Sequence, residues 1–269
     1  MLNANGFNAY SYKSILQPLG FNTIALDMRG HGMSNLPIDI HNLKNWNIFR
    51  DDIIEFFDRY IKNPVVLAGH SYGAVSGILA MPEIKNKVTG FVGFDPVLLP
   101  WPARLFSHFS WFREIAKQKL PVAKHAGRRK YKFESFEAAF DRYKKRGVFK
   151  DFTNDALKNY LIGGLIYDDE GVKLSCNPLW EQAIYAAQAH NVFNSIKYLP
   201  QKNSDIIFAG RGGSVSYQSG RNAFERKLGK NSVSFNLELD HMFPFNNPDF
   251  AISRLQEALS KSALNPQAV

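Results

Sequence analysis

The chain has 269 residues, a length that suits one large domain or one domain carrying an insertion. With 45% hydrophobic and 21% charged residues, it falls outside the disordered, collagenous and coiled-coil classes. A net charge of +9 is compatible with nucleic acid, an acidic membrane surface or an anionic substrate as partner. The simplest interpretation is a solvated helical face, because the basic residues do not interleave with aromatics as in nucleic-acid modules. Much of the charge lies in Lys124, Arg128, Arg129, Lys130, Lys132, Lys144, Lys145 and Arg146.

The single cysteine, Cys176, cannot form an internal disulfide, so the sequence does not imply an oxidising compartment. No segment has the ~18 unbroken apolar residues of a membrane span. The N-terminus lacks the basic start, apolar run and cleavage site of a signal peptide. We therefore expect a cytoplasmic protein with no membrane span and no nucleic-acid partner.

Short apolar runs predict buried parallel strands, because both of their faces are hydrophobic. These runs are residues 23–26, 65–68, 88–94, 206–209 and 233–239. Helical patterns lie between most of them, at residues 46–61 and 74–80, and another closes the chain at 250–259. This alternation predicts an α/β fold in which helices cover both faces of a mostly parallel sheet.

Residues 100–199 break the alternation, since this stretch is helix-rich, aromatic and basic and contains no clear strand. It is inserted between two predicted strands, at the carboxyl edge of the sheet. We interpret residues 1–99 and 200–269 as the core and residues 100–199 as a helical lid over the site. Its aromatic residues, Trp101 and Trp180 among them, are expected to shape an apolar substrate pocket or to be core residues.

The segment Gly69-His70-Ser71-Tyr72-Gly73 has the pattern of a nucleophile elbow. The pattern is weak alone, but here a strand precedes it and a helix start follows it, as the motif requires. Such a turn exposes the serine oxygen, while the two glycines let strand and helix approach closely. We expect Ser71 to be the nucleophile, activated by a base that takes its proton.

His241 is the expected base, because it directly follows the last predicted strand in chain order. The acid is less determined. The loop after the penultimate strand, residues 210–214, contains no carboxylate, whereas Asp95 ends the strand that follows the elbow helix. Asp95 is therefore either the triad acid or only a cap of its loop. Asp240, next to the histidine, is expected to point the other way.

An oxyanion hole needs two backbone N–H groups aimed at the developing negative charge. Tyr72, directly after the nucleophile, is expected to supply one of them. The early loop Asn5-Gly6-Phe7 is expected to supply the other from Phe7, with Gly6 letting the backbone approach the substrate.

These motifs together resemble the α/β-hydrolase superfamily over nearly the whole chain. The resemblance includes the early Asn3 loop, Asp27-Met28-Arg29-Gly30-His31-Gly32-Met33-Ser34, the elbow and the terminal His241 segment. It implies that Asp27 and Arg29 support loops near the site without being catalytic. Residues 126–129, 163–165 and 176–181 resemble the helical cap of bacterial members described as hydrolases or acyltransferases.

The chain departs from that family in three places. Asn3 stands where relatives carry a loop-supporting histidine. The loop after the penultimate strand, where relatives carry the triad acid, has no Asp or Glu. The oxyanion loop, which follows the third strand in the family, here begins at residue 3. We therefore expect the N-terminal strands to be missing, with the true start upstream or the chain a fragment, and at most a stub of that third strand to be present.

The sequence predicts a cofactor-free, metal-free serine hydrolase that acts on a small, apolar acyl compound such as an ester or thioester. An acyltransferase or lyase on the same scaffold is the alternative within enzymes. A binding protein that has lost turnover is an alternative of another class, and binding of nucleic acid or an acidic surface through the basic lid is a third.

Overall fold

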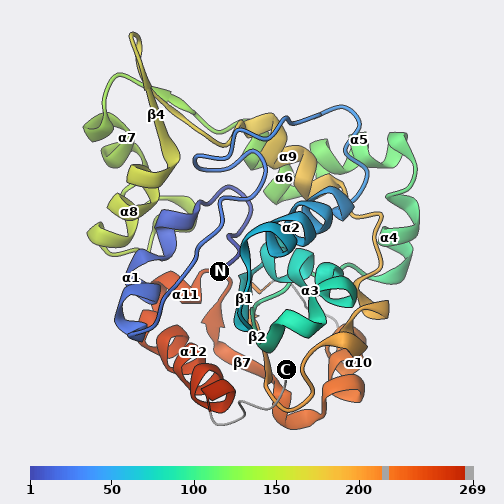
Figure 1. Ribbon diagram of the computed structural model, residues 1–269. Helices are drawn as coiled ribbons and strands as arrows, with labels where there is room; N and C mark the ends of the chain where they lie inside the picture. The colour runs from blue at the N-terminus through green and yellow to red at the C-terminus, as the bar shows by residue number, and fades with distance from the viewer. Residues whose placement is uncertain (214–217, 264–269) are drawn as a thin grey trace.

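The computed structural model describes residues 1–213 and 218–263 (Figure 1). Within these residues a parallel four-stranded sheet has the order β1-β2-β6-β7. Its strands are β1 (Val65–His70), β2 (Val88–Phe94), β6 (Ser204–Arg211) and β7 (Val233–Asp240). Four of the predicted strands are thus confirmed, with ends within three residues of the expected ones.

Helices alternate with the strands of this sheet and fill most of the 100–199 segment. They are α1 (Lys13–Leu16), α2 (Asn47–Tyr60), α3 (Tyr72–Ile84), α4 (Trp101–Phe106), α5 (Ser110–Lys119), α6 (Pro121–Gly127), α7 (Phe136–Tyr143), α8 (Asn154–Gly164), α9 (Pro178–Ala186), α10 (Gln218–Leu228), α11 (Phe243–Asn246) and α12 (Pro248–Ala263).

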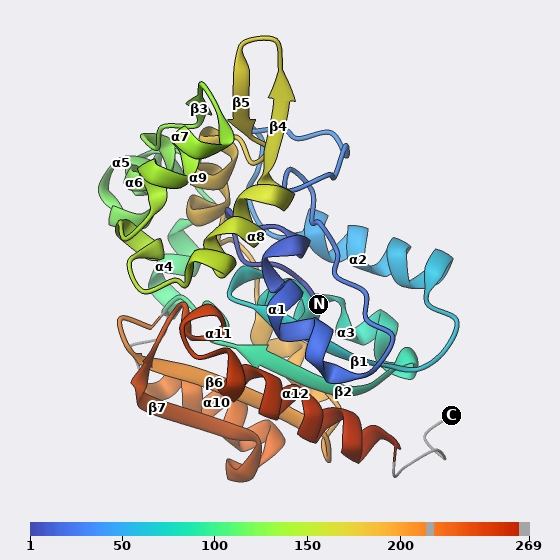
Figure 2. The ribbon, with the colours of Figure 1, turned by 90° about the vertical axis from the view of Figure 1, so that its left-hand side faces the viewer.

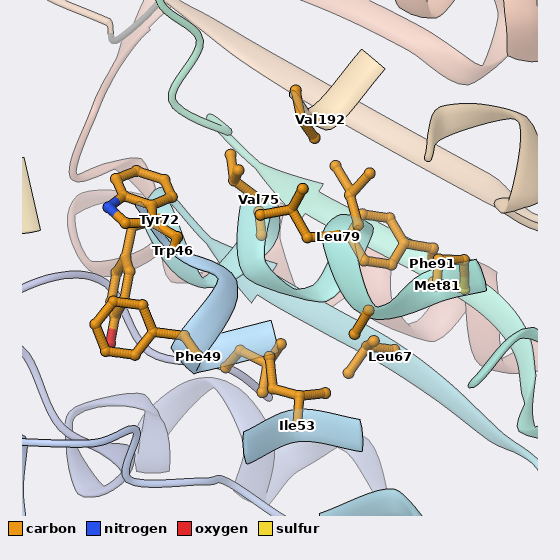
Figure 3. Close-up of a cluster of buried hydrophobic side chains, with 14 of the residues drawn as sticks. Trp46, Phe49, Ile53, Leu67, Tyr72, Val75, Leu79, Met81, Phe91 and Val192 are labelled. Carbon is orange, nitrogen blue, oxygen red and sulfur yellow. The ribbon is translucent and has the colours of Figure 1, made fainter. Parts of the chain in front are cut away.

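Both faces of β1, β2 and β6 are buried, because successive side chains of these strands enter two different cores, whereas the edge strand β7 exposes Phe235 and Leu237. Leu67 of β1 packs toward α2 and α3, whereas the next residue, Ala68, packs toward α1 and α12. Figure 3 shows the first of these cores, where side chains of α2 and α3 meet those of β1 and β2. The sheet is therefore sandwiched between helices, as the continuous apolar runs predict.

The predicted strand at residues 23–26 is wrong, since only Leu26 makes a bridge there. Leu2 lies between Leu26 and Gly69, with parallel bridges to both. Its N–H donates to Ala68 O at 2.8 Å, and its carbonyl accepts from His70 N–H at 3.1 Å. With only Met1 and Leu2 as neighbours, residues 23–26 lack the partner that a ladder needs. The expected stub of a strand at this place is confirmed.

The expectation that the 100–199 segment contains no strand is also wrong. Three short strands form an antiparallel sheet of their own in the order β3-β5-β4: β3 (Lys132–Phe133), β4 (Leu165–Asp168) and β5 (Gly171–Leu174). Figure 2 shows β4 and β5 as a hairpin far from the parallel sheet. At two or four residues each, such strands are too short to show an apolar periodicity in the sequence.

Local capping explains where several helices of this segment begin. Ser135 and Thr153 accept a hydrogen bond from the backbone N–H three residues on, at the starts of α7 and α8. Asn177 does the same for Leu179 at the start of α9, where Pro178 occupies the first helical position. Each cap satisfies an N–H group that the helix itself leaves without a partner.

Candidate active site

Ser71 sits on the turn between β1 and α3, with φ at 57° and ψ at −120°. A positive φ is costly for a residue with a side chain, so the surrounding structure must hold it in place. The two flanking glycines make the turn possible. A Cβ at Gly69 would lie 2.6 Å from the Cα of Ala74, and one at Gly73 would lie 2.5 Å from the carbonyl oxygen of Asn3. The elbow therefore needs glycine at both positions, as the sequence predicts.

Asp95 lies at the end of β2 and contacts the ring of His241, which follows β7. The Nδ1 of His241 is 2.5 Å from Oδ2 of Asp95. The other carboxylate oxygen accepts the N–H of Ala209 at 3.0 Å, and the Asp95 side chain is fully buried. Asp95 also has a positive φ of 43°, like Ser71. The carboxylate is therefore fixed on the histidine and does not merely cap its loop.

A backbone hydrogen bond ties Ser71 to the end of β2. The Ser71 N–H donates to the carbonyl of Phe94, the residue before Asp95, at 2.8 Å. Among the described residues the Ser71 hydroxyl makes no hydrogen bond to His241. Hydrogen bonds between nucleophile and base are often long in enzymes without substrate. Asp240 faces elsewhere, as expected, since its carboxylate accepts from Met242 N–H at 2.8 Å and from the Asn246 amide at 3.0 Å.

His70 connects the backbone of His241 to the early loop. The Tyr12 hydroxyl accepts the N–H of Ala4 and lies 2.9 Å from Nδ1 of His70, so its one proton goes to that nitrogen. The proton on Nε2 of His70 is then donated to the carbonyl of His241 at 2.9 Å. Burial lowers the pKa of His70 to about 3, which keeps this neutral form at ordinary pH. The sequence identified His70 only as part of the elbow.

In the loop at residues 3–8, the N–H groups of Ala4, Gly6, Phe7 and Asn8 are engaged within the protein. Phe7 N–H donates to Ala4 O at 3.0 Å, so it is not free to hold an oxyanion as expected. Gly6 N–H donates to Nε2 of His31 at 3.0 Å. Among the described residues, no acceptor is bonded to Asn5 N–H. The second donor expected at Phe7 therefore fits Asn5 better.

The side chains of His31 and Asn3 fix this loop by hydrogen bonds to its backbone. Burial lowers the pKa of His31 to about 4, so the ring stays neutral, with the proton on Nδ1 facing Arg29 O at 3.1 Å. The Asn3 amide donates to Ala4 O and Phe7 O, each at 2.9 Å, and its oxygen accepts from Met28 N–H at 3.0 Å. Asn3 thus supports the loop through three hydrogen bonds.

The 100–199 segment touches the loop through Glu181. The Asn5 amide donates to Glu181 O at 3.0 Å, and a Cβ at Gly6 would lie 2.6 Å from the Glu181 carboxylate. Arg129 pairs with that carboxylate at 2.6 Å, and burial still raises the pKa of Glu181 above its usual value although Arg129 opposes the shift. Gly6, expected to make room for substrate, makes room for Glu181 in this structure.

The two tryptophans expected at a substrate pocket lie elsewhere. Trp180 is fully buried in the core, and its indole N–H donates to Arg29 O at 3.1 Å. Trp101 is 66% exposed and lines a surface groove of about 710 Å³ with His108, His190 and Asn191. Trp180 is thus a core residue, which was one of the two alternatives expected, and the contacts of neither tryptophan place it beside Ser71.

Asp27 and Arg29 support loops, as the resemblance implies. The Asp27 carboxylate accepts the N–H groups of Ala9 and Met33 at 2.7 and 2.9 Å. Arg29 binds Asp52 of α2 through two nitrogens at 2.8 and 2.6 Å. The described residues contain no group of three His, Cys, Asp or Glu side chains that could hold a metal ion. Ser214, the last residue of the loop at residues 210–214 that was expected to hold no carboxylate, lies outside the described residues.

Comparison with known proteins identifies the fold and the family. A family model described as serine aminopeptidase, S33, matches residues 10–231. The crystal structure of an E-2-(acetamidomethylene)succinate hydrolase has a TM-score of 0.73, with 17% identity over 96% of this chain and 89% of that one. An esterase of Mycobacterium tuberculosis has a TM-score of 0.70, with 18% identity over 96% and 83% of the two chains.

One stretch of the chain also resembles a curated enzyme in sequence. It is 33% identical over 75 residues to 2-(acetamidomethylene)succinate hydrolase of Mesorhizobium japonicum. The match covers 28% of this chain and 26% of that enzyme. The parallel sheet flanked by helices is therefore an α/β-hydrolase fold, and it is shared with hydrolases.

Proposed function

The chain belongs to the serine aminopeptidase S33 family of α/β-hydrolases, and on that basis we propose that it cleaves a carboxylic ester or related acyl bond through an acyl-enzyme on Ser71. The observation that carries the proposal is the 2.5 Å contact between Asp95 and His241, beside a serine with positive φ at the strand–helix turn. A buried carboxylate on Nδ1 fixes the histidine tautomer that leaves Nε2 free to accept a proton.

In the proposed reaction Ser71 Oγ attacks the carbonyl carbon while Nε2 of His241 takes its proton. The ring then carries a positive charge, which the Asp95 carboxylate stabilises without taking the proton. His241 returns the proton to the leaving group. Water, activated by the same nitrogen, attacks the acyl-enzyme and releases the acid, while the proton returns to Ser71.

We assign the oxyanion to the N–H groups of Tyr72 and Asn5. Tyr72 begins α3, so its N–H belongs to the first turn, where helices leave donors unpaired. The carbonyl of Asn3 packs against Gly73, which puts the start of the early loop beside that turn. Removing one such donor costs roughly 10²–10³-fold in kcat in other enzymes, but a backbone N–H cannot be deleted by ordinary substitution.

We further propose that residues 100–199 act as a cap on the core of residues 1–99 and 200–269, in a cytoplasmic enzyme without a cofactor. The contact of Glu181 with Asn5 and Gly6 supports this role, since it ties the segment to the loop of the proposed oxyanion hole. An acyltransferase would use the same acyl-enzyme and differ only in the acceptor that replaces water.

The test is hydrolysis of p-nitrophenyl esters of increasing acyl length by wild-type protein and two serine variants. Ser71→Ala is expected to lose roughly 10⁶-fold in kcat. Ser76→Ala is the matched control, because Ser76 lies on the same helix and its buried hydroxyl has no hydrogen-bond partner among the described residues. Equal rates for the wild type and the Ser71 variant would refute the proposal. A rate that rises with acyl length would support an apolar substrate.

A further inference from the structure

The positive charge of the chain is concentrated in one segment. Residues 101–132 contain nine Lys or Arg and one Glu, a net charge of +8, while the whole chain has +9. This segment forms α4, α5 and α6 and the start of β3, and these helices lie together at one side of the molecule (Figures 1 and 2). The rest of the chain is therefore nearly neutral, and the charge is a local property of these helices.

The same helices expose a set of large apolar side chains, which we call the exposed apolar surface. Its members are Trp101, Leu105, Phe106, Phe109, Trp111 and Ile115. The rings of Phe106 and Trp111 have centroids 6.4 Å apart, and those of Phe109 and Trp111 are 6.2 Å apart. These contacts join the end of α4 to the start of α5, so Phe106, Phe109 and Trp111 form a continuous centre of this surface. Contiguous apolar surface of this kind marks an interaction site more often than scattered single residues do.

Helix α5 is turned so that its arginine is inside and its tryptophan is outside. The Arg113 guanidinium is buried and donates to the carbonyls of Ser107 and His108 at 2.9 and 3.0 Å. Trp111 and Ile115, one turn apart, are 54% and 49% exposed. In a helix whose outer side faced only water, the arginine would be exposed and the tryptophan buried, because burying an arginine is costly unless its donors are satisfied.

Exposed lysines and arginines lie close in sequence to further exposed apolar residues at the end of α5 and on α6. Lys119 and Lys124 flank the exposed Leu120 and Val122 at the junction of α5 and α6. Arg128 and Lys130 follow, and none of these four cations pairs with a carboxylate among the described residues. Aliphatic side chains beside cations that pair with no carboxylate match a lipid membrane, where acyl chains lie beneath anionic headgroups. Nucleic acid would match the cations, but it has no apolar phase in which Ile115, Leu120 and Val122 could be buried.

We propose that α4, α5 and α6 form a docking surface for an anionic lipid membrane. Trp111, Phe109 and their apolar neighbours enter the boundary between headgroups and acyl chains, where tryptophan is favoured. Lys119, Lys124, Arg128 and Lys130 bind the anionic headgroups. The protein then binds the membrane at one face without crossing it, and the described residues contain no helix able to cross.

The test is co-sedimentation of the full chain with vesicles of phosphatidylcholine, with and without phosphatidylserine. We expect binding only where phosphatidylserine is present, and weaker binding as salt is added. Lys119→Gln and Lys124→Gln should each lower the partition coefficient about fivefold. Trp111→Ser with Phe109→Ser should lower it roughly tenfold or more.

Matched controls distinguish binding through this surface from nonspecific binding through any exposed aromatic or basic side chain. Tyr167→Ser removes an aromatic side chain that is 67% exposed on β4, and Lys202→Gln removes an exposed charge on the core. Both controls should bind vesicles like the wild type, and circular dichroism should show all variants folded. Absence of binding to phosphatidylserine vesicles would overturn the proposal. So would binding that the tryptophan and phenylalanine changes leave intact, or a duplex DNA that competes fully with the vesicles.

Discussion

Two groups of aromatic side chains on the 100–199 segment differ in what covers them. The buried aromatic cluster joins Phe149, Phe152 and Tyr160 to Phe7 and Phe245, with ring centroids of Phe7 and Phe245 5.1 Å apart. The exposed apolar surface on α4 and α5 has rings of the same kind that pack on one another and on the half-buried Phe112 and are otherwise exposed to solvent. The first group anchors the loop beside Ser71, and the second is free to meet a partner.

The difference teaches that aromatic content alone does not define a substrate pocket. Near Ser71 the aromatic rings hold backbone in place. Tyr12 and His31 accept hydrogen bonds from the early loop, and His70 donates one to the backbone of His241, so these bonds orient the groups proposed to react. On α4 and α5 no comparable hydrogen bond fixes a ring. Changes in the first region should therefore affect catalysis and stability, and changes in the second should affect only binding.

The largest effect is expected at the proposed triad acid. Asp95→Asn should lower kcat for ester hydrolysis about 10⁴-fold, because an amide cannot stabilise the charged ring and favours the wrong tautomer. Steady-state kinetics measure the loss, and Asp240→Asn is the control, since that carboxylate faces Met242 and Asn246. A loss at Asp95 of less than about tenfold would remove it from the triad.

The two aromatic groups can be compared directly by truncation. Phe149→Ala should cost about 3–5 kcal/mol of unfolding free energy, because the ring is buried among Phe7, Tyr143, Phe152 and Tyr160. Trp111→Ala should change it by about 0.5 kcal/mol or less. Urea denaturation gives both values, and similar costs for the two variants would mean that the comparison is wrong.

Acid should weaken the region around Ser71 through its buried histidines. The pKa of His70 is lowered to about 3 and that of His31 to about 4, against 6.5 for each in the unfolded chain. The unfolded state therefore takes up protons first, and stability present above pH 6.5 is lost as the pH falls below it. At pH 5 the loss is about 2 kcal/mol for each histidine.

Urea denaturation at pH 7 and pH 5 checks this sign and size. His70→Gln should remove about half of the loss assigned to these two histidines, while His41→Gln, at an exposed position, should remove none of it. A pH dependence unchanged by the His70 substitution would contradict the neutral, buried assignment.

A smaller effect is expected on the position of His241. His70→Leu leaves the carbonyl of His241 and the hydroxyl of Tyr12 without their partner, so kcat should fall by roughly 10–100-fold with little change in KM. His70→Gln offers an amide donor and a carbonyl acceptor in similar places and should retain most activity. Equal losses in both variants would argue that His70 matters only for packing.

The sequence predicted the sheet and the elbow because these rest on local patterns, while the pairing of Ser71 with His241 stays a prediction. Apolar runs identify buried strands, and the order of Ser71 and His241 follows the order of the strand ends. Asp95 remained one of two interpretations, since the contact with His241 joins residues 146 positions apart. Only the parallel pairing of β1, β2, β6 and β7 brings those strand ends together.

The wrong prediction for Phe7 and the missed roles of Tyr12, His31 and His70 also depend on contacts that a local pattern does not reveal. The N–H of Phe7 was assigned to the oxyanion by its place in the loop, but the turn at Ala4 engages it. The roles of Tyr12, His31 and His70 depend on burial, which a histidine or tyrosine in a sequence does not reveal. The sequence offered two signals for the histidines: His70 lies inside the elbow, and His31 lies four residues after Asp27 in the segment shared with the family.

The central claim is tested most directly by labelling with a fluorophosphonate probe, followed by mass spectrometry of the modified peptide. The account predicts one covalent adduct, on Ser71, which is absent from Ser71→Ala and strongly slowed in Asp95→Asn. A folded wild-type protein that takes no label, or takes it on a residue other than Ser71, would contradict the account.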